Sequence, residues 1–208
     1  KGWFPLQRQE IHKGGPAPRR LSQPVPEPEA VPAEVGDVSG LELILVEQES
    51  QMRIWNELMI GEHPQGAGPL VGRQIRYLIG SAHGWLAGFG FAAPALQLAD
   101  RDRWIGWDSE QRRAHLQGVL CLSRFLIRPS VECRNLASRL LSMSLQQVVE
   151  DFQRRYHYRP WLVESFLDTS RFSGASYRAA NWILVGQTKG RGRQDRFSQR
   201  EKTIKDIY

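Results

Sequence analysis

The chain has 208 residues, 41% of them hydrophobic, and its formal net charge of +6 favours nucleic acid as a partner, ahead of an anionic membrane surface or a phosphorylated cofactor. The length is enough for one substantial domain of about 150 residues with appendages, and no run approaches the roughly 18 apolar residues that a membrane-spanning helix needs. Two cysteines, Cys121 and Cys133, come without paired histidine spacing, which excludes a zinc site of the usual kind, and the lack of a secretory leader predicts a reducing, cytoplasmic compartment.

Residues 1–38 hold seven of the twelve prolines. The run QPVPEPEAVPAEVG is too rich in proline for a helix or a central strand, so it is predicted to be a semi-extended linker. The preceding GWFPL is expected to act as a short extended arm. We therefore divide the chain into an arm and linker over 1–38, a globular domain over 39–188 and a basic tail over 189–208.

The first half of the globular domain begins with a short strand over 43–46 and a helix over 47–59, where apolar residues recur at helical spacing. Two alternating strands follow, joined by a hairpin at 81–84. Gly88 and Gly90 lie inside the second strand and indicate a bulge or a close approach of another chain segment. The charged stretch from Asp100 is predicted to be a loop that leads into a short helix, with Asp108 as its N-cap.

The centre of the domain is the stretch LSRFLIRPSVECRNLASRLL. An apolar strand over 119–127 ends at Arg128-Pro129, because proline cannot donate to a sheet ladder and disfavours helical geometry in the residue before it. A helix of about 24 residues follows. Its predicted buried face consists of Leu136, Leu140, Val148, Phe152 and Tyr156. A strand, turn and helix N-terminus in this order suit an anion site, but ordinary strand–helix packing gives the same pattern.

The last part of the domain contains a strand over 161–167, a short helix over 176–182 and a final strand over 182–187. The order of elements predicts an α/β (α+β) fold with a mixed sheet flanked by helices.

This order resembles that of the GCN5-related N-acetyltransferase family. In that family the turn after a central strand begins Arg/Gln-x-x-Gly and holds the pyrophosphate of acetyl-CoA. The corresponding residues here are Arg134, Asn135 and Ala137, and the stretch from Tyr177 to Trp182 corresponds to a later tyrosine-bearing helix. Ala137 stands in place of the glycine that lets the backbone approach a phosphate. The resemblance therefore implies the fold rather than the cofactor, and no cofactor is predicted.

Longer motifs resemble the DruA family of the Druantia anti-phage system, whose domain also occurs with transposases. These motifs are GWFPLQRQ, WNELM, GPLVGRQIRYLI, RDRWIGWD, LSRFLIRP, CRNLAS, RYHYRPWLVESFLD, RFSGASYRAANWILVGQTKGRGRQD and KTIKDIY. They cover nearly everything except the proline-rich linker. The resemblance implies phage defence or mobile-element biology and contact with DNA.

The basic C-terminal part is the plainest functional signal. In KGRGR the glycines leave the backbone free while the cations contact phosphates. A solvated tail is the alternative, and cations alone confer affinity without sequence choice. The predicted contact residues are Lys189, Arg191, Arg193, Arg196, Arg200 and Lys202.

A second group of residues is expected near a point where strands splay apart. We expect Arg124, with Ser123, to lie beside Glu164, which acts either as a general base with a shifted pKa or as one partner of a structural ion pair. Tyr177 is the candidate hydroxyl acid, or else part of a turn that closes over the core.

Three tryptophans and two histidines complete the candidates. Asn181 and Trp182 are predicted to read a base, although a tryptophan at a helix end is often part of the core. Trp104, like Trp107, either forms a stacking surface or covers the sheet. His63 and His83 lack metal-ligand spacing, so no metal is predicted.

Three hypotheses follow. The first is a DNA-binding accessory module of a transposon or anti-phage system. The second is an acyltransferase-like enzyme that modifies a nucleobase or a protein amine. The third is an interaction module that recruits a transposase or helicase. None involves a membrane.

Overall fold

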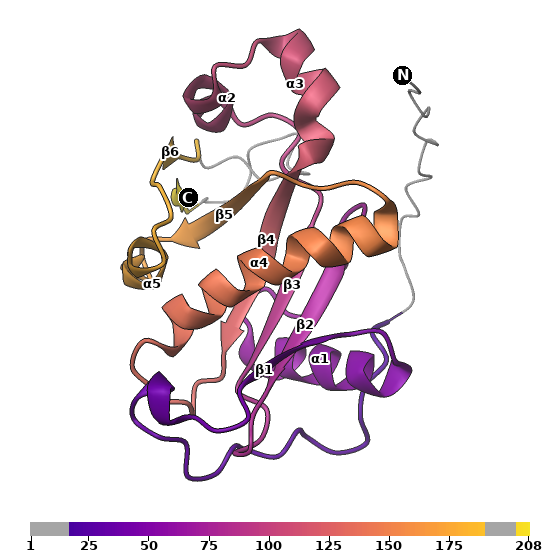
Figure 1. The fold of residues 1–208 in the computed structure, drawn as a ribbon, viewed down its shortest axis with the longest axis vertical. Helices are drawn as coiled ribbons and strands as arrows, with labels where there is room; N and C mark the ends of the chain where they lie inside the picture. Colours follow the sequence, from indigo (N-terminus) through magenta and orange to yellow (C-terminus); the bar gives the residue numbers. More distant parts are fainter. Residues whose placement is uncertain (1–16, 190–202) are drawn as a thin grey trace.

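The computed structural model describes residues 17–189 and 203–208, which form a seven-stranded sheet with helices on both faces (Figure 1). The strand order is β1-β2-β3-β4-β5-β7-β6, and all neighbours are antiparallel except β4 and β5, which are parallel. The strands are β1 (Glu42–Leu45), β2 (Ile75–Gly80), β3 (Ala87–Ala92), β4 (Val119–Ile127), β5 (Leu162–Asp168), β6 (Gly186–Gln187) and β7 (Lys205–Ile207). The helices are α1 (Glu49–Glu62), α2 (Ala99–Ile105), α3 (Ser109–His115), α4 (Leu136–Tyr156) and α5 (Ala175–Ala179), with short 3-10 turns η1 (Val35–Asp37) and η2 (Leu116–Gly118).

The predicted mixed α/β class is confirmed, and so are most predicted elements. Asp108 caps α3 as expected, since its side chain accepts from the backbone amides of Glu110 and Gln111. The prediction of a loop from Asp100 onward is wrong, because α2 occupies most of this stretch. That helix ends at Gly106, whose φ of 86° is easily reached only by glycine. The predicted strand over 182–187 is much shorter than expected, because only β6 forms.

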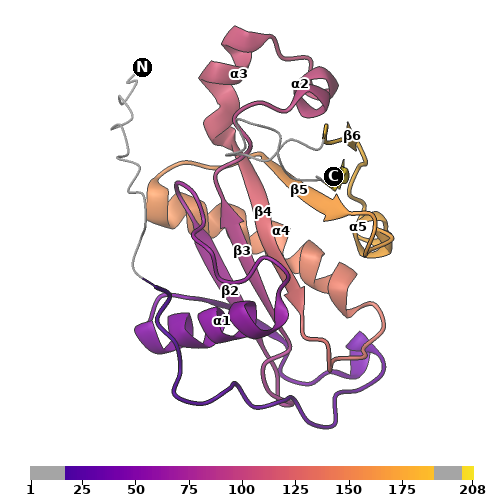
Figure 2. The same ribbon diagram turned by 180° about the vertical axis from the view of Figure 1, so that it is seen from behind.

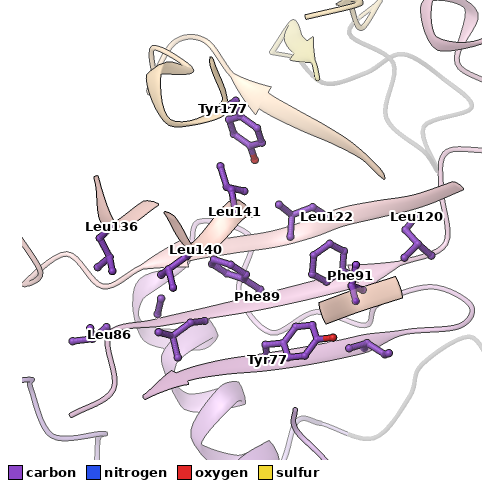
Figure 3. Packing of buried hydrophobic residues seen from close by; sticks show 14 of the residues in the cluster. Tyr77, Leu86, Phe89, Phe91, Leu120, Leu122, Leu136, Leu140, Leu141 and Tyr177 are labelled. Carbon is purple, nitrogen blue, oxygen red and sulfur yellow. The ribbon is translucent and has the colours of Figure 1, made fainter. Parts of the chain in front are cut away.

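The core has two parts, one on each face of the sheet. Helix α4 covers one face, and its predicted residues Leu136, Leu140, Val148 and Phe152 are buried while Tyr156 is partly buried. Figure 3 labels Leu136 and Leu140 in this cluster. Helix α1 crosses the opposite face over β1–β3 (Figure 2). Each fully buried side chain of this size stabilises the fold by about 1.5–3 kcal/mol.

Both predictions for the two strand glycines are confirmed. The register of β3 against β4 shifts between Gly90 and Phe91, which is a bulge. A Cβ atom on Gly88 would lie 2.7 Å from Cε of Met59, so α1 approaches the sheet backbone closely here. The Trp55 indole also donates to the carbonyl of Phe89 at 2.9 Å.

The proline-rich segment is extended, but its described part is not a free linker. Val25 is buried, and the buried side chain of Arg128 donates to the carbonyl of Pro26 at 2.6 Å. Arg128 also pairs with Glu62 of α1 at 2.8 Å. Residues 17–38 therefore pack against the rest of the described chain.

The last residues of the predicted C-terminal tail are paired in the sheet. Strand β7 pairs with both β5 and β6, and Tyr208 is buried. The amide of Thr188 donates to the carbonyl of Lys205 at 2.8 Å, and the amide of Lys205 donates to Oγ1 of Thr188 at 2.9 Å. The basic stretch therefore connects two paired strands of the sheet.

Candidate nucleic-acid interface

The point where β4 and β5 part is filled by aromatic side chains. The two strands pair from Val119 to Leu122 of β4, after which β5 pairs with β7 while β4 continues with β3 as its only neighbour in the described sheet. Tyr177 of α5 is buried here, with its hydroxyl 2.8 Å from Oγ of Ser165 and its ring 5.9 Å from that of Phe125 (Figure 3). Burial raises the pKa of Tyr177 to about 12. This geometry favours packing over proton donation for Tyr177.

Glu164 is buried as predicted, but it pairs with Arg101 and not with Arg124 as expected. Its carboxylate accepts from the Arg101 guanidinium at 2.8 Å and from the amide of Ala95 at 2.7 Å. Arg101 also pairs with Asp102, which in turn meets Arg112. Burial raises the pKa of Glu164 although the Arg101 charge opposes the shift. The network ties α2 to β5 and is balanced in charge.

Arg124 faces the α1 side of the sheet instead. Its guanidinium donates to the carbonyl of Gly66 at 2.9 Å and to the side-chain oxygen of Gln65 at 2.9 Å. It is 9% exposed and has no carboxylate partner among the residues that the structure describes, and burial lowers its pKa. Ser123 is the extra residue of the β4 bulge, and its hydroxyl donates to the carbonyl of Cys121. Arg124 therefore shapes the loop after α1 while it keeps an unbalanced charge.

His63, for which the sequence predicts no metal role, lies within electrostatic reach of three cations. Its Nδ1 accepts from the amide of Gln65 at 3.1 Å, so the proton resides on Nε2. Burial, together with the charges of Arg124, Arg171 and Lys205, lowers the pKa of His63 to about 4. We call Arg124, Arg171 and Lys205 the cation cluster. It brings together β4, the turn after β5, and β7.

The turn before α4 does not have the expected character of an anion site. Arg134 pairs with Glu34, and its amide donates to the carbonyl of Ala33 at 2.7 Å. Asn135 precedes the helix with φ of 62° and makes no side-chain cap, and Ala137 lies in the first turn. Because the docked N-terminal segment uses Arg134 and brings an acidic side chain to the turn, a phosphate is disfavoured here.

A cavity of about 340 Å³ lies beside β5 on a different part of the surface. Trp104 and Trp161 line it and are 50% and 56% exposed, while Trp182 lines it with its ring 5.1 Å from that of Tyr177. We call this cavity the tryptophan pocket. Asn181 also lines it and is exposed with φ of 60°. The further lining residues are Arg101, Leu145, Val149, Pro160, Leu162, Val163, Glu164, Ala180, Ile183, Val185, Ile207 and Tyr208.

The predicted phosphate contacts are only partly within the described residues. Lys189 is exposed at the end of β6, and Lys205 stands where the chain re-enters the sheet. Arg191, Arg193, Arg196, Arg200 and Lys202 lie outside the described residues.

Residues 17–189 and 203–208 contain neither a candidate metal site nor a candidate membrane-spanning helix. No group of three or more His, Cys, Asp or Glu side chains in these ranges could hold a metal ion. No helix there is long and apolar enough to cross a membrane.

A family model described as Druantia protein DruA matches residues 7–206. The chain belongs to the DruA family of the Druantia anti-phage system. The DruA match begins in the N-terminal segment and ends in β7, so it includes both the docked proline-rich stretch and the basic stretch between β6 and β7. A search of curated proteins gave no match.

Three side chains that shape these DruA surfaces carried no clear signal in the sequence. Arg101 and Arg171 stand among many other arginines, and nothing local marks their partners. Trp161 is the first residue of the strand predicted over 161–167, but β5 begins one residue later and Trp161 stays exposed.

Proposed function

We propose that this DruA protein is a DNA-binding accessory domain of an anti-phage or transposon-associated system, and that the basic segment 189–205 makes the main contact. The observation that carries the proposal is the distribution of charge. The described residues contain 20 Lys and Arg against 19 Asp and Glu, whereas residues 190–202 contain five against two. The folded domain is thus nearly neutral, and half of the net charge of +6 lies in residues 190–202, with a further +2 in residues 1–16. A short stretch with this density of positive charge attracts a polyanion.

The cation cluster supports the same function from within the described residues. Lys205 belongs both to the basic segment and to this cluster. Neither Arg124 nor Arg171 forms an ion pair within the described ranges, while most scaffold arginines do. The charge of Arg124 therefore adds to the field that attracts phosphates. Asp168 offsets part of the charge of Arg171 and Lys205, since both of these cations help to lower its pKa.

Salt dependence of DNA binding tests the proposal. The logarithm of the binding constant should fall with the logarithm of the salt concentration, with a slope near −0.9 for each phosphate contacted on duplex DNA. Replacement of Arg191, Arg193 and Arg196 by glutamine should make the slope shallower by roughly 2 to 3.

A matched control replaces Arg53, Arg103 and Arg159, which are exposed and already paired with scaffold carboxylates. This control removes the same charge but should change the slope much less. A slope near zero for the unmodified protein, on both duplex and single-stranded DNA, would refute DNA binding.

An acyltransferase-like activity is the second candidate. It is favoured by the parallel pair β4–β5, which parts after Leu122, and by the bulge in β4, features we relate to the acetyltransferase-like sheet. It is weakened by Tyr177, which fills the space, and by the Arg134–Glu34 pair at the α4 turn. Calorimetry with acetyl-CoA tests it, and no heat at millimolar ligand would exclude that cofactor.

A transposase or helicase is the proposed protein partner. A pull-down after nuclease treatment would show whether such a contact is direct or depends on shared DNA.

A further inference from the structure

We infer that the tryptophan pocket binds an unstacked nucleobase of single-stranded nucleic acid. The inference rests on the proposed function and names the part of the ligand that the basic segment cannot recognise. Cationic side chains hold phosphates but do not distinguish a strand with bases from a bare sugar–phosphate chain. Aromatic rings do, because every base offers a face for stacking.

The first observation is that Trp161 is exposed but held in place. A Cβ atom on Gly118 would lie only 2.0 Å from its Nε1, so the indole rests directly on the backbone at Gly118. The amide of Trp161 donates to the carbonyl of Gly118 at 2.9 Å, and the ring meets Trp107 edge-on at 5.5 Å. The ring is thus fixed on one side and open to solvent on the other, as a stacking platform requires.

The second observation is that Trp104 is also held by its element. Its helix α2 is fixed to β5 by the buried pair Arg101–Glu164. The same helix is fixed to β6, because the amide of Gln187 donates to Oδ2 of Asp100 at 3.0 Å. The pocket is therefore preformed, which lowers the entropic cost of binding a ring.

The third observation concerns size and chemistry. A volume of about 340 Å³ is at the small end for ligand sites and suits a single ring system. The lining is mainly apolar, but the exposed Asn181 brings an amide with one donor group and one acceptor group to it. This combination of apolar walls with a donor and an acceptor matches the flat face and polar edge of a base.

The fourth observation is the position of the pocket beside the basic segment. Val185 and Ile207 line the pocket, and each lies within four residues of a lysine at one end of that segment, Lys189 or Lys205. A strand held by the segment would therefore carry its bases past the pocket.

The test compares two single strands of about 16 nucleotides, the upper site size of common single-strand-binding domains. One strand carries bases and the other is abasic throughout. The proteins are the unmodified chain, Trp161→Ala, Trp104→Ala and, as a matched control, Phe172→Ala. Phe172 is 52% exposed and does not line the pocket.

The unmodified protein should bind the strand with bases more tightly than the abasic strand. Trp161→Ala and Trp104→Ala should each lower affinity for the strand with bases by roughly tenfold to a hundredfold. Their affinity for the abasic strand and their salt slope should not change, and Phe172→Ala should behave like the unmodified protein. Circular dichroism and thermal unfolding confirm that each variant is folded.

The experiment distinguishes failure of the pocket inference from failure of the proposed function. If the unmodified protein binds both strands equally with a clear salt slope, or if the tryptophan variants behave like Phe172→Ala, the pocket inference is overturned while the proposed function stands. If it binds neither of these strands nor duplex DNA, the proposed function fails as well, whereas binding to duplex DNA alone overturns only the pocket inference.

Discussion

Replacement of Arg128 tests whether the N-terminal segment is an integral part of the fold. The side chain is 1% exposed and joins three parts of the chain. It pairs with Glu62 of α1, donates to the carbonyls of Val25 and Pro26, and meets Glu27 at 2.9 Å. Arg128→Met keeps most of the side-chain volume but removes every one of these hydrogen bonds.

The expected loss in the free energy of unfolding is about 3–5 kcal/mol, the usual result when one partner of a buried ion pair is removed. Most of this cost comes from leaving Glu62 and two carbonyls without a donor. Glu27 adds little, because it is largely exposed and screened. For a domain of this size such a loss lowers Tm by roughly 6–20 °C.

Urea and thermal denaturation followed by circular dichroism measure this loss. The control is Arg159→Ala, which breaks an exposed pair with Glu150 and should cost at most about 1 kcal/mol. The double variant of Arg128→Met with Glu62→Met should recover part of the loss, because no carboxylate is then left unpaired. If Arg128→Met is as stable as Arg159→Ala, the segment is not held in the way the structure shows.

Three further predictions concern buried polar groups. Tyr77→Phe should lower the free energy of unfolding by about 1.5–3 kcal/mol in urea denaturation, because the Tyr77 hydroxyl donates to the buried carboxylate of Asp151 at 2.6 Å, and a change below about 0.5 kcal/mol would contradict this role. The pKa of Glu164 is raised in the folded state, so above the ordinary value of 4.5 the unfolded chain releases a proton that the folded state still holds. The free energy of unfolding should therefore decline as pH rises above that value. Glu164→Gln should remove this decline in denaturation curves taken at several pH values. The lowered pKa of His63 gives the opposite sign, since the unfolded chain binds a proton below about 6.5 and the folded chain only below about 4. The free energy of unfolding should therefore fall as pH drops through this window, and His63→Asn should flatten that fall. An unchanged dependence of stability on pH in the variant would show that His63 is not shielded.

The local features of the fold were predictable from the sequence. The apolar face of α4 recurs at helical spacing, and burial follows that spacing whatever the face packs against. Asp108 caps α3 through its own neighbours, and the glycines of β3 mark a close approach that needs only a missing Cβ. In each case the residue that gives the signal lies in, or directly beside, the element whose structure it determines.

Apart from helix α2 and the short strand β6, the errors concern partners distant in the sequence. Prolines predict an extended chain but do not show that it docks under Arg128. Strand β7 has three residues after a charged stretch and no periodic signal, so its pairing follows only from the open edge of β5. Glu164 could meet either of two arginines, and the bulge in β4 helps decide which, because the side chain of Arg124 is directed to the loop after α1.

The two proposals together divide binding between separate parts of the molecule. The described domain is almost neutral, so it cannot by itself generate a strong salt dependence. The sequence of the basic segment supplies mainly cations, with Phe197 as its one aromatic residue, whereas the tryptophan pocket supplies Trp161 fixed on Gly118. Changes to the segment should therefore alter the salt slope but not the preference for a strand with bases, and changes to the tryptophan pocket should do the reverse. A variant combining Trp161→Ala with the three arginine replacements should then lose binding energy equal to the sum of the two separate losses, since distant sites act additively. A combined loss well below that sum would show that both sets of residues act on one contact, and the division would be wrong.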